Sequence, residues 1–105
     1  MRNWEIMNKI ISYIGFAIKS KKYIAGQTPL KYSKQPIHLI LVCNTASHNL
    51  KNLAKNIANK NSCDYIITKE KLSTLTRIDD VKIFGILDES LSNAIKTNKE
   101  MIEIG

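Results

Sequence analysis

The chain has 105 residues, of which 44% are apolar, and its formal net charge at pH 7 is +7. This length predicts a single domain with a modest core, above the size at which small folds usually need disulfides or metals. The longest apolar stretch near the start, residues 10–18, is about half of the roughly 20 residues that a membrane span requires, so we expect neither a membrane helix nor a signal peptide.

The two cysteines, Cys43 and Cys63, lack the paired spacing of a zinc site and are too few for a secreted disulfide scaffold. We therefore expect a reducing compartment and a cytoplasmic protein. The thiols fall at the end of one predicted strand and the start of the next. If these strands are parallel neighbours, the thiols lie at opposite ends of the sheet, beyond the roughly 7 Å limit for bridged Cα atoms, and both stay free. His38 and His48 favour structural or solvent-exposed roles, so no metal or cofactor is expected.

The charge is unevenly distributed along the chain. Residues 1–60 hold ten Lys or Arg and one acid, a net charge of +9, whereas residues 61–105 hold six against eight, a net charge of −2. A concentrated positive field attracts polyanions, so nucleic acid is the leading partner class and an anionic membrane surface the second. The alternative is a merely solvated surface, because A/T-rich codons also enrich a chain in lysine.

The first half of the chain alternates between helical and strand patterns. Apolar residues recur at helical spacing at Trp4, Met7, Ile11, Ile14 and Ile18. They predict an amphipathic helix over residues 4–19, with Trp4 in the core rather than stacked on a base. A short strand follows at residues 23–25. The apolar run 37–43 predicts a buried strand, and Ser47 can cap the helix after it.

The second half continues the alternation. Residues 65–67 predict a strand, and Thr68 can cap a short helix that runs through Leu75. Residues 81–87 predict the last strand, and Asp88 can cap the last helix. Strands that alternate with helices predict an α/β fold with helices on both faces of a mostly parallel or mixed sheet.

Three strings resemble parts of a known family when their order and spacing are considered together. They are "YIGFAIKSKKYIAGQ", "LILVCNTASHNLKNLAKNI" and "VKIFGILDESLSNAI", and they cover nearly the whole chain. They resemble the small kink-turn RNA-binding ribosomal proteins of the large subunit, of the seven-A-e and thirty-e type, and their short bacterial ribosome-associated relatives. The resemblance implies one kink-turn-binding domain over residues 1–105, folded as a three-layer α/β/α sandwich around a four-stranded mixed sheet.

In that family, RNA is held by a glycine turn with the start of the next helix, and by the loops after the second strand and before the last. These positions map onto residues 26–34, 44–48 and 77–80. The RNA-binding residues that the resemblance and the local lysines imply are Lys21, Lys22, Gly26, Gln27, Thr28, Lys31, Lys34, Asn44, Ser47, Arg77 and Ile78.

The chemistry of the glycine turn agrees with this assignment. Gly26 lets a sugar-phosphate backbone come close, and amides at a helix start can donate to phosphate. Gln27 and Thr28 can bond base edges or sugar hydroxyls, while the lysines pair with phosphates. The chain departs from the family at Pro29, where an acidic or amide side chain usually reads guanine, and at Tyr32, where a lysine is usual. Proline suits the first turn of a helix, and its presence predicts binding with little base specificity.

The glycine pair that the family has near its fourth helix is also replaced, by Ser73 and Arg77.

Two functions stay open. The first is a non-enzymatic RNA-binding protein, ribosomal or ribosome-associated, that docks on kink-turn-like RNA. The second is a relative that kept the fold and acts through protein contacts as an interaction or assembly module. An enzyme is not expected, because Cys43 and His48 lack a third orienting group.

The expected partner is structured RNA, with ribosomal RNA as the candidate that the resemblance implies. We expect no membrane partner and no small-molecule substrate, and we expect the chain to act as a monomer.

Overall fold

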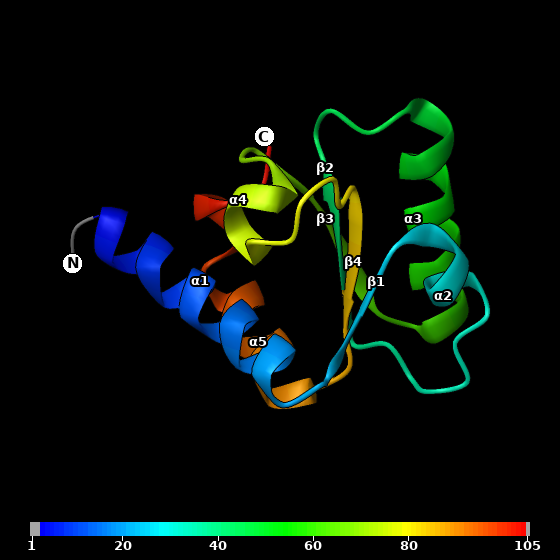
Figure 1. Cartoon of the computed structure of the whole chain (residues 1–105), viewed down its shortest axis with the longest axis horizontal. Helices are drawn as coiled ribbons and strands as arrows, with labels where there is room; N and C mark the ends of the chain where they lie inside the picture. The colour runs from blue at the N-terminus through cyan, green and yellow to red at the C-terminus, as the bar shows by residue number, and fades with distance from the viewer. Residues whose placement is uncertain (1–2, 105) are drawn as a thin grey trace.

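The computed structural model describes residues 3–104 and shows a four-stranded mixed sheet between two layers of helices (Figure 1). Helices α1 (Asn3–Lys19), α4 (Leu72–Thr76) and α5 (Glu89–Thr97) cover one face, and a 3-10 turn, η1 (Lys99–Met101), follows α5. Helices α2 (Gln27–Lys31) and α3 (His48–Asn61) cover the other face. The predicted three-layer α/β/α sandwich is confirmed. Within residues 3–104, no helix is both long and apolar enough to cross a membrane.

The strands are β1 (Tyr23–Ala25), β2 (Leu39–Cys43), β3 (Asp64–Thr68) and β4 (Ile83–Ile86), in the spatial order β1-β4-β2-β3. Strand β2 is parallel to β3, whereas β4 runs antiparallel to both β1 and β2. The last residues of β1, β2 and β3 therefore lie at the same edge of the sheet as the first residue of β4. This topology brings loops from distant parts of the sequence together at one edge.

Helix α1 packs against α4 and α5 and contributes Ile10, Ile14 and Ala17, which are fully buried, to the core. Trp4 is 59% exposed, so the prediction that it belongs to the core is wrong. At about 100° per residue, Trp4 is turned about 120° away from Ile10 around the helix axis. The apolar stripe predicted from the sequence shares Ile14 with the buried face, but Ile10 and Ala17 are fully buried in place of Ile11 and Ile18, which are half-buried.

Two of the three predicted helix caps are confirmed. Ser47 precedes α3, and its hydroxyl accepts a hydrogen bond from the Leu50 amide at 3.1 Å. Asp88 precedes α5, and its carboxylate accepts from the Leu91 amide at 2.8 Å. Each cap satisfies one of the amides that the first turn of a helix leaves without a partner.

The third predicted cap, Thr68, is wrong. Thr68 is the last residue of β3 and pairs with Cys43 of β2, and its hydroxyl donates to the Glu70 carbonyl at 2.7 Å. Helix α4 begins later, at Leu72, after Lys71, which makes no side-chain cap bond. Pairing with the central strand keeps Thr68 extended, and this tertiary contact outweighs its local preference to cap.

Helix α2 is held close to the sheet by a glycine in β4. A Cβ atom built on Gly85 would lie 2.5 Å from Cδ2 of Leu30 and 3.5 Å from Cγ2 of Ile37. Both of these apolar side chains are buried. The absence of a side chain at Gly85 thus lets Leu30 dock, and this contact positions the short helix that follows the glycine turn.

Candidate nucleic-acid interface

Three of the predicted RNA-binding segments meet at one edge of the sheet. The Gly26 amide donates to the Ile83 carbonyl at 3.1 Å, and the Cys43 amide donates to the Lys82 carbonyl at 2.8 Å. The Lys82 ammonium donates to the hydroxyl of Thr45 at 2.8 Å. We call this edge, formed by residues 26–28, 44–47 and 77–82, the loop edge. It contains seven of the predicted residues: Gly26, Gln27, Thr28, Asn44, Ser47, Arg77 and Ile78.

The glycine turn has a backbone conformation that only glycine adopts readily. Gly26 has φ 98° and ψ 152°, and Gln27 and Thr28 follow it as exposed residues in the first turn of α2. Pro29 is exposed in the same turn, which agrees with its predicted structural role. The turn leaves its backbone uncovered by a Cβ atom and offers two hydrogen-bonding side chains to a ligand.

Asn44 and Ser47 are engaged in the fold itself. The Asn44 amide nitrogen donates to the Lys69 carbonyl at 2.9 Å and so joins the end of β2 to the end of β3. The Ser47 hydroxyl oxygen caps α3. Both predicted residues are therefore on the loop edge, where they shape its backbone rather than offer free polar groups. The exposed side chain beside them is Thr45.

Arg77 and Ile78 have different environments. Arg77 follows α4 in the left-handed conformation, with φ 60°, and its side chain is exposed. Ile78 is half-buried against the core, and its amide donates to the Thr76 hydroxyl at 3.1 Å. A cavity of about 260 Å³ lies beside Arg77, between α1 and α4. Arg77 is thus available to a phosphate, whereas Ile78 contributes packing.

Two of the four predicted lysines, Lys21 and Lys22, lie away from the glycine turn. Lys21 and Lys22 precede β1, and the Lys22 carbonyl accepts from the Leu87 amide at 2.9 Å at the opposite edge of the sheet. A strand rises about 3.3 Å per residue, so Lys22 and Gly26 are separated by roughly 13 Å. Lys31 and Lys34 are exposed at and beyond the end of α2. The densest lysines and the glycine therefore do not form one compact site.

The charge of the loop edge and its surroundings is nearly balanced. Lys69, Lys71, Arg77 and Lys82 are offset there by Glu70, Asp79 and Asp80. In contrast, the layer formed by α2, α3 and the segment between α2 and β2 contains no Asp or Glu. Its basic residues are Lys31, Lys34, Lys51, Lys55 and Lys60. Five of the ten basic residues among residues 1–60 thus lie in a positive layer beside the loop edge.

Two residues that sequence reasoning missed belong to this interface. Lys82 bonds Thr45 and directly precedes β4, whereas the sequence predicted it as the second residue of the last strand and gave no signal for a role in binding. Tyr32, which ends α2, is 72% exposed, and the Lys31 ammonium lies 5.8 Å from the centre of its ring. A ring this exposed can stack on a base, and the nearby cation adds a cation–π contact.

The two thiols lie at opposite ends of β2 and β3, as predicted, and both are free. Burial alone raises the pKa of the Cys43 thiol, but hydrogen bonds from Thr45 and from the Leu72 backbone, with the charge of Lys82, bring the net pKa below its ordinary value. Burial and the nearby Asp64 carboxylate raise the pKa of Cys63. Cys43 is 1% exposed, so its thiolate is shielded from reagents.

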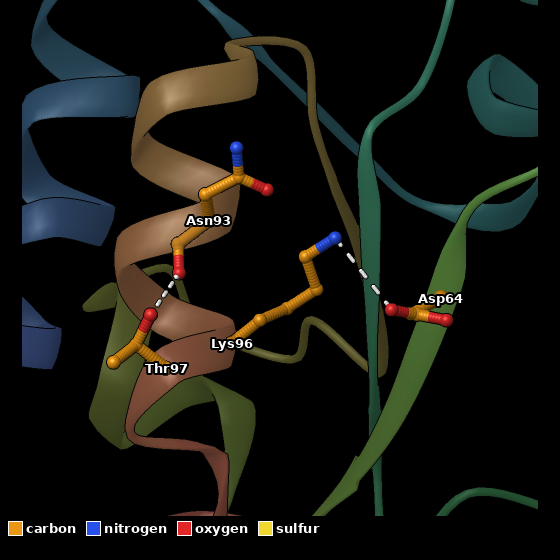
Figure 2. A network of polar contacts seen from close by, with 4 residues as sticks. All are labelled: Asp64, Asn93, Lys96 and Thr97. Carbon is orange, nitrogen blue, oxygen red and sulfur yellow. Dashed lines mark hydrogen bonds and ion pairs between the residues drawn. The ribbon is translucent and has the colours of Figure 1, made fainter.

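A second cavity, also of about 260 Å³, lies at the opposite edge of the sheet, between the end of α3, residues Glu89, Asn93 and Lys96 of α5, and the segments that lead into β2 and β3. Figure 2 shows Lys96 reaching from α5 toward Asp64, with 3.5 Å between the charged atoms. In the same view, the Thr97 hydroxyl donates to the Asn93 carbonyl at 2.8 Å. Within residues 3–104, no three His, Cys, Asp or Glu side chains gather as a metal site.

No protein-family model matches this chain, and no curated protein matches it. Among solved structures, the chain is similar to that of a protein with unknown function from Bacillus halodurans C. The TM-score is 0.73 at 12% sequence identity, and the alignment covers 88% of this chain and 97% of the other. At this identity the likeness shows a shared α/β fold, and it carries no function from one protein to the other.

Proposed function

We propose that this chain is a non-enzymatic RNA-binding protein of the cytoplasm that docks on a bent or internal-loop RNA, as part of the ribosome or associated with it. The observation that carries the proposal is the junction of two surfaces at α2. An acid-free layer with five lysines lies directly beside a loop edge that contains the half-buried Gly26 and exposes the hydrogen-bonding side chains of Gln27 and Thr28. This combination suits a ligand that has both phosphates and unpaired bases.

The two surfaces have different tasks in this proposal. Lys31 and Lys34 neutralise phosphates, and Gly26 allows the RNA backbone to approach the turn. Gln27 and Thr28 bond sugar hydroxyls or base edges, and Tyr32 offers a stacking surface. Lys21 and Lys22, at the opposite edge, are reached only by RNA that follows the length of β1.

The test is the salt dependence of binding to an RNA stem that contains an internal loop. Three to five phosphate contacts predict a slope of about −2 to −4.5 for log affinity against log salt. Changing Lys31 and Lys34 to Gln should make the slope less steep, whereas the same change at Lys9 and Lys19 on α1 removes equal charge from the opposite layer and serves as the control. Binding that does not depend on salt, or equal effects of both pairs, would contradict the proposal.

A protein-interaction or assembly module is the second candidate. It is favoured by Trp4 and Phe16, which are each 59% exposed on α1, on the face of the sheet opposite the basic layer. Crosslinking in cells separates the two functions. RNA crosslinked to α2 and the loop edge supports the first, and protein crosslinked to α1 without any RNA supports the second.

A further inference from the structure

The outer face of α3 has a composition that helix stability does not explain. Its exposed or half-buried polar residues are His48, Asn49, Lys51, Asn52, Lys55, Asn56, Asn59 and Lys60. Asn is a poor helix former, and an acid-free helix lacks the Glu–Lys pairs that stabilise a solvent-exposed face. Among residues 3–104, the lysines of α3 form no ion pair. The polar groups of this face are therefore available to a ligand.

The arrangement of these residues is regular. Ala54, Ile57 and Ala58 face the core. At about 100° per residue, the amides of Asn52, Asn56 and Asn59 project along the middle of the opposite face. Lys55 lies on one side of this row of amides and Lys60 on the other, along a helix about 21 Å long. A strip of groups that donate and accept hydrogen bonds is thus bordered by positive charge.

We propose that this face of α3 binds the backbone of a double-helical RNA stem that adjoins the bent element held at the loop edge. The inference rests on the proposed function and adds a second contact to it. A-form RNA displays its 2′-hydroxyls in a wide, shallow minor groove between two phosphate strands. The 2′-hydroxyl both donates and accepts, as an Asn amide does, and the flanking lysines match the phosphates on either side.

The same face argues against single-stranded RNA as the ligand. Binding of single strands depends on aromatic side chains that stack on bases, and α3 contains no Phe, Tyr or Trp, its one imidazole being His48 in the first turn. The exposed aromatic side chain of this layer is Tyr32, which directly follows α2. Because α2 and α3 pack side by side on one face of the sheet (Figure 1), one RNA can place unpaired bases at α2 and a stem along α3.

The test uses three probes: an RNA duplex of about 20 base pairs, a DNA duplex of the same sequence, and the RNA stem with an internal loop. The duplex is longer than the roughly 16 base pairs that a double-stranded-RNA-binding domain spans. In the first variant, Lys55 and Lys60 are changed to Gln. Its salt slope on the RNA duplex should be less steep by about 1.4 to 1.8. In the second, Asn52 and Asn56 are changed to Ala, which should lower the preference for RNA over DNA and leave the slope unchanged.

The control variant changes Lys9 and Lys19 of α1 to Gln, which removes the same charge from the opposite layer. The inference is overturned if this variant weakens duplex binding as much as Lys55→Gln with Lys60→Gln, or if the asparagine variant keeps the full preference for RNA. If the internal-loop RNA binds through Lys31 and Lys34 while the duplex does not bind, the inference alone fails. If the wild-type chain binds neither RNA, both proposals fail. Circular dichroism confirms that each variant is folded.

Discussion

Replacing Gly85 by alanine tests how the fold positions the candidate interface. The added Cβ would lie 2.5 Å from Cδ2 of Leu30, well inside the contact distance of two carbon atoms. Leu30 is 2% exposed, and Gly85 is buried, so the leucine has little room to turn away. The strain is therefore expected to push α2 outward, together with Gln27 and Thr28.

The expected magnitude follows from two opposing effects. Overpacking a core costs about 1–3 kcal/mol, and replacing glycine by alanine within a strand recovers about 0.5–1 kcal/mol of chain entropy. The two ranges leave a net loss between 0 and about 2.5 kcal/mol, and their midpoints predict that the free energy of unfolding falls by about 1 kcal/mol. Each kcal/mol lowers the melting temperature of a domain of about this size by roughly 4–8 °C.

Urea unfolding followed by circular dichroism measures this loss, with an unchanged m value as evidence that only stability has changed. Leu30→Ala alone should cost about 2–5 kcal/mol. The double variant should cost less than the sum of the two single variants, because the clash disappears with the leucine. As a control, Gly15→Ala lies on α1, where no described atom comes within 4 Å of the new Cβ, and should stabilise the chain by about 0.5–1 kcal/mol. A Gly85→Ala chain as stable as wild type, or strict additivity in the double variant, would refute the reasoning.

Three further predictions concern the loop edge and α1. In a chain with Cys63 changed to serine, the thiolate absorbance of Cys43 should develop at a lower pH than that of a thiol with the ordinary pKa of 9.0. Lys82→Met should shift this titration to higher pH, because the substitution removes a positive charge near the thiolate. A titration that Lys82→Met leaves unchanged would argue against the electrostatic effect of Lys82 on Cys43. Gly26→Val should lower the free energy of unfolding, measured in urea, by about 1–3 kcal/mol, because a φ of 98° strains a β-branched residue. A Gly26→Val chain as stable as the wild type would contradict this prediction. Ile14 is fully buried and Phe16 is 59% exposed. Ile14→Ala should therefore lower the free energy of unfolding by about 2–5 kcal/mol, and Phe16→Ala should lower it by less than about 0.5 kcal/mol. Equal decreases in the melting temperature of the two variants would show that α1 is packed differently.

Local chemistry in the sequence determined the class of fold and the start of two helices. The change from strand to helical periodicity is a property of neighbouring residues, so the alternation of elements was visible without the structure. Ser47 and Asp88 cap their helices because the amides they accept from lie three residues further on. Thr68 has the same local preference to cap a helix, but its pairing with Cys43 keeps it in strand β3.

Tertiary structure alone decided which residues share a surface. Lys22 and Gly26 are neighbours in sequence, yet the strand between them carries them to opposite edges of the sheet, because an extended chain separates its ends by about 3.3 Å per residue. Thr45 and Lys82 are far apart in sequence, yet antiparallel pairing of β2 with β4 places them in hydrogen-bond contact at 2.8 Å. Strand order depends on how the whole chain buries its apolar faces, and no local pattern encodes it. For the same reason, the sequence predicted Lys31 and Lys34 as RNA-binding residues but not that they share a layer with Lys51, Lys55 and Lys60 of α3.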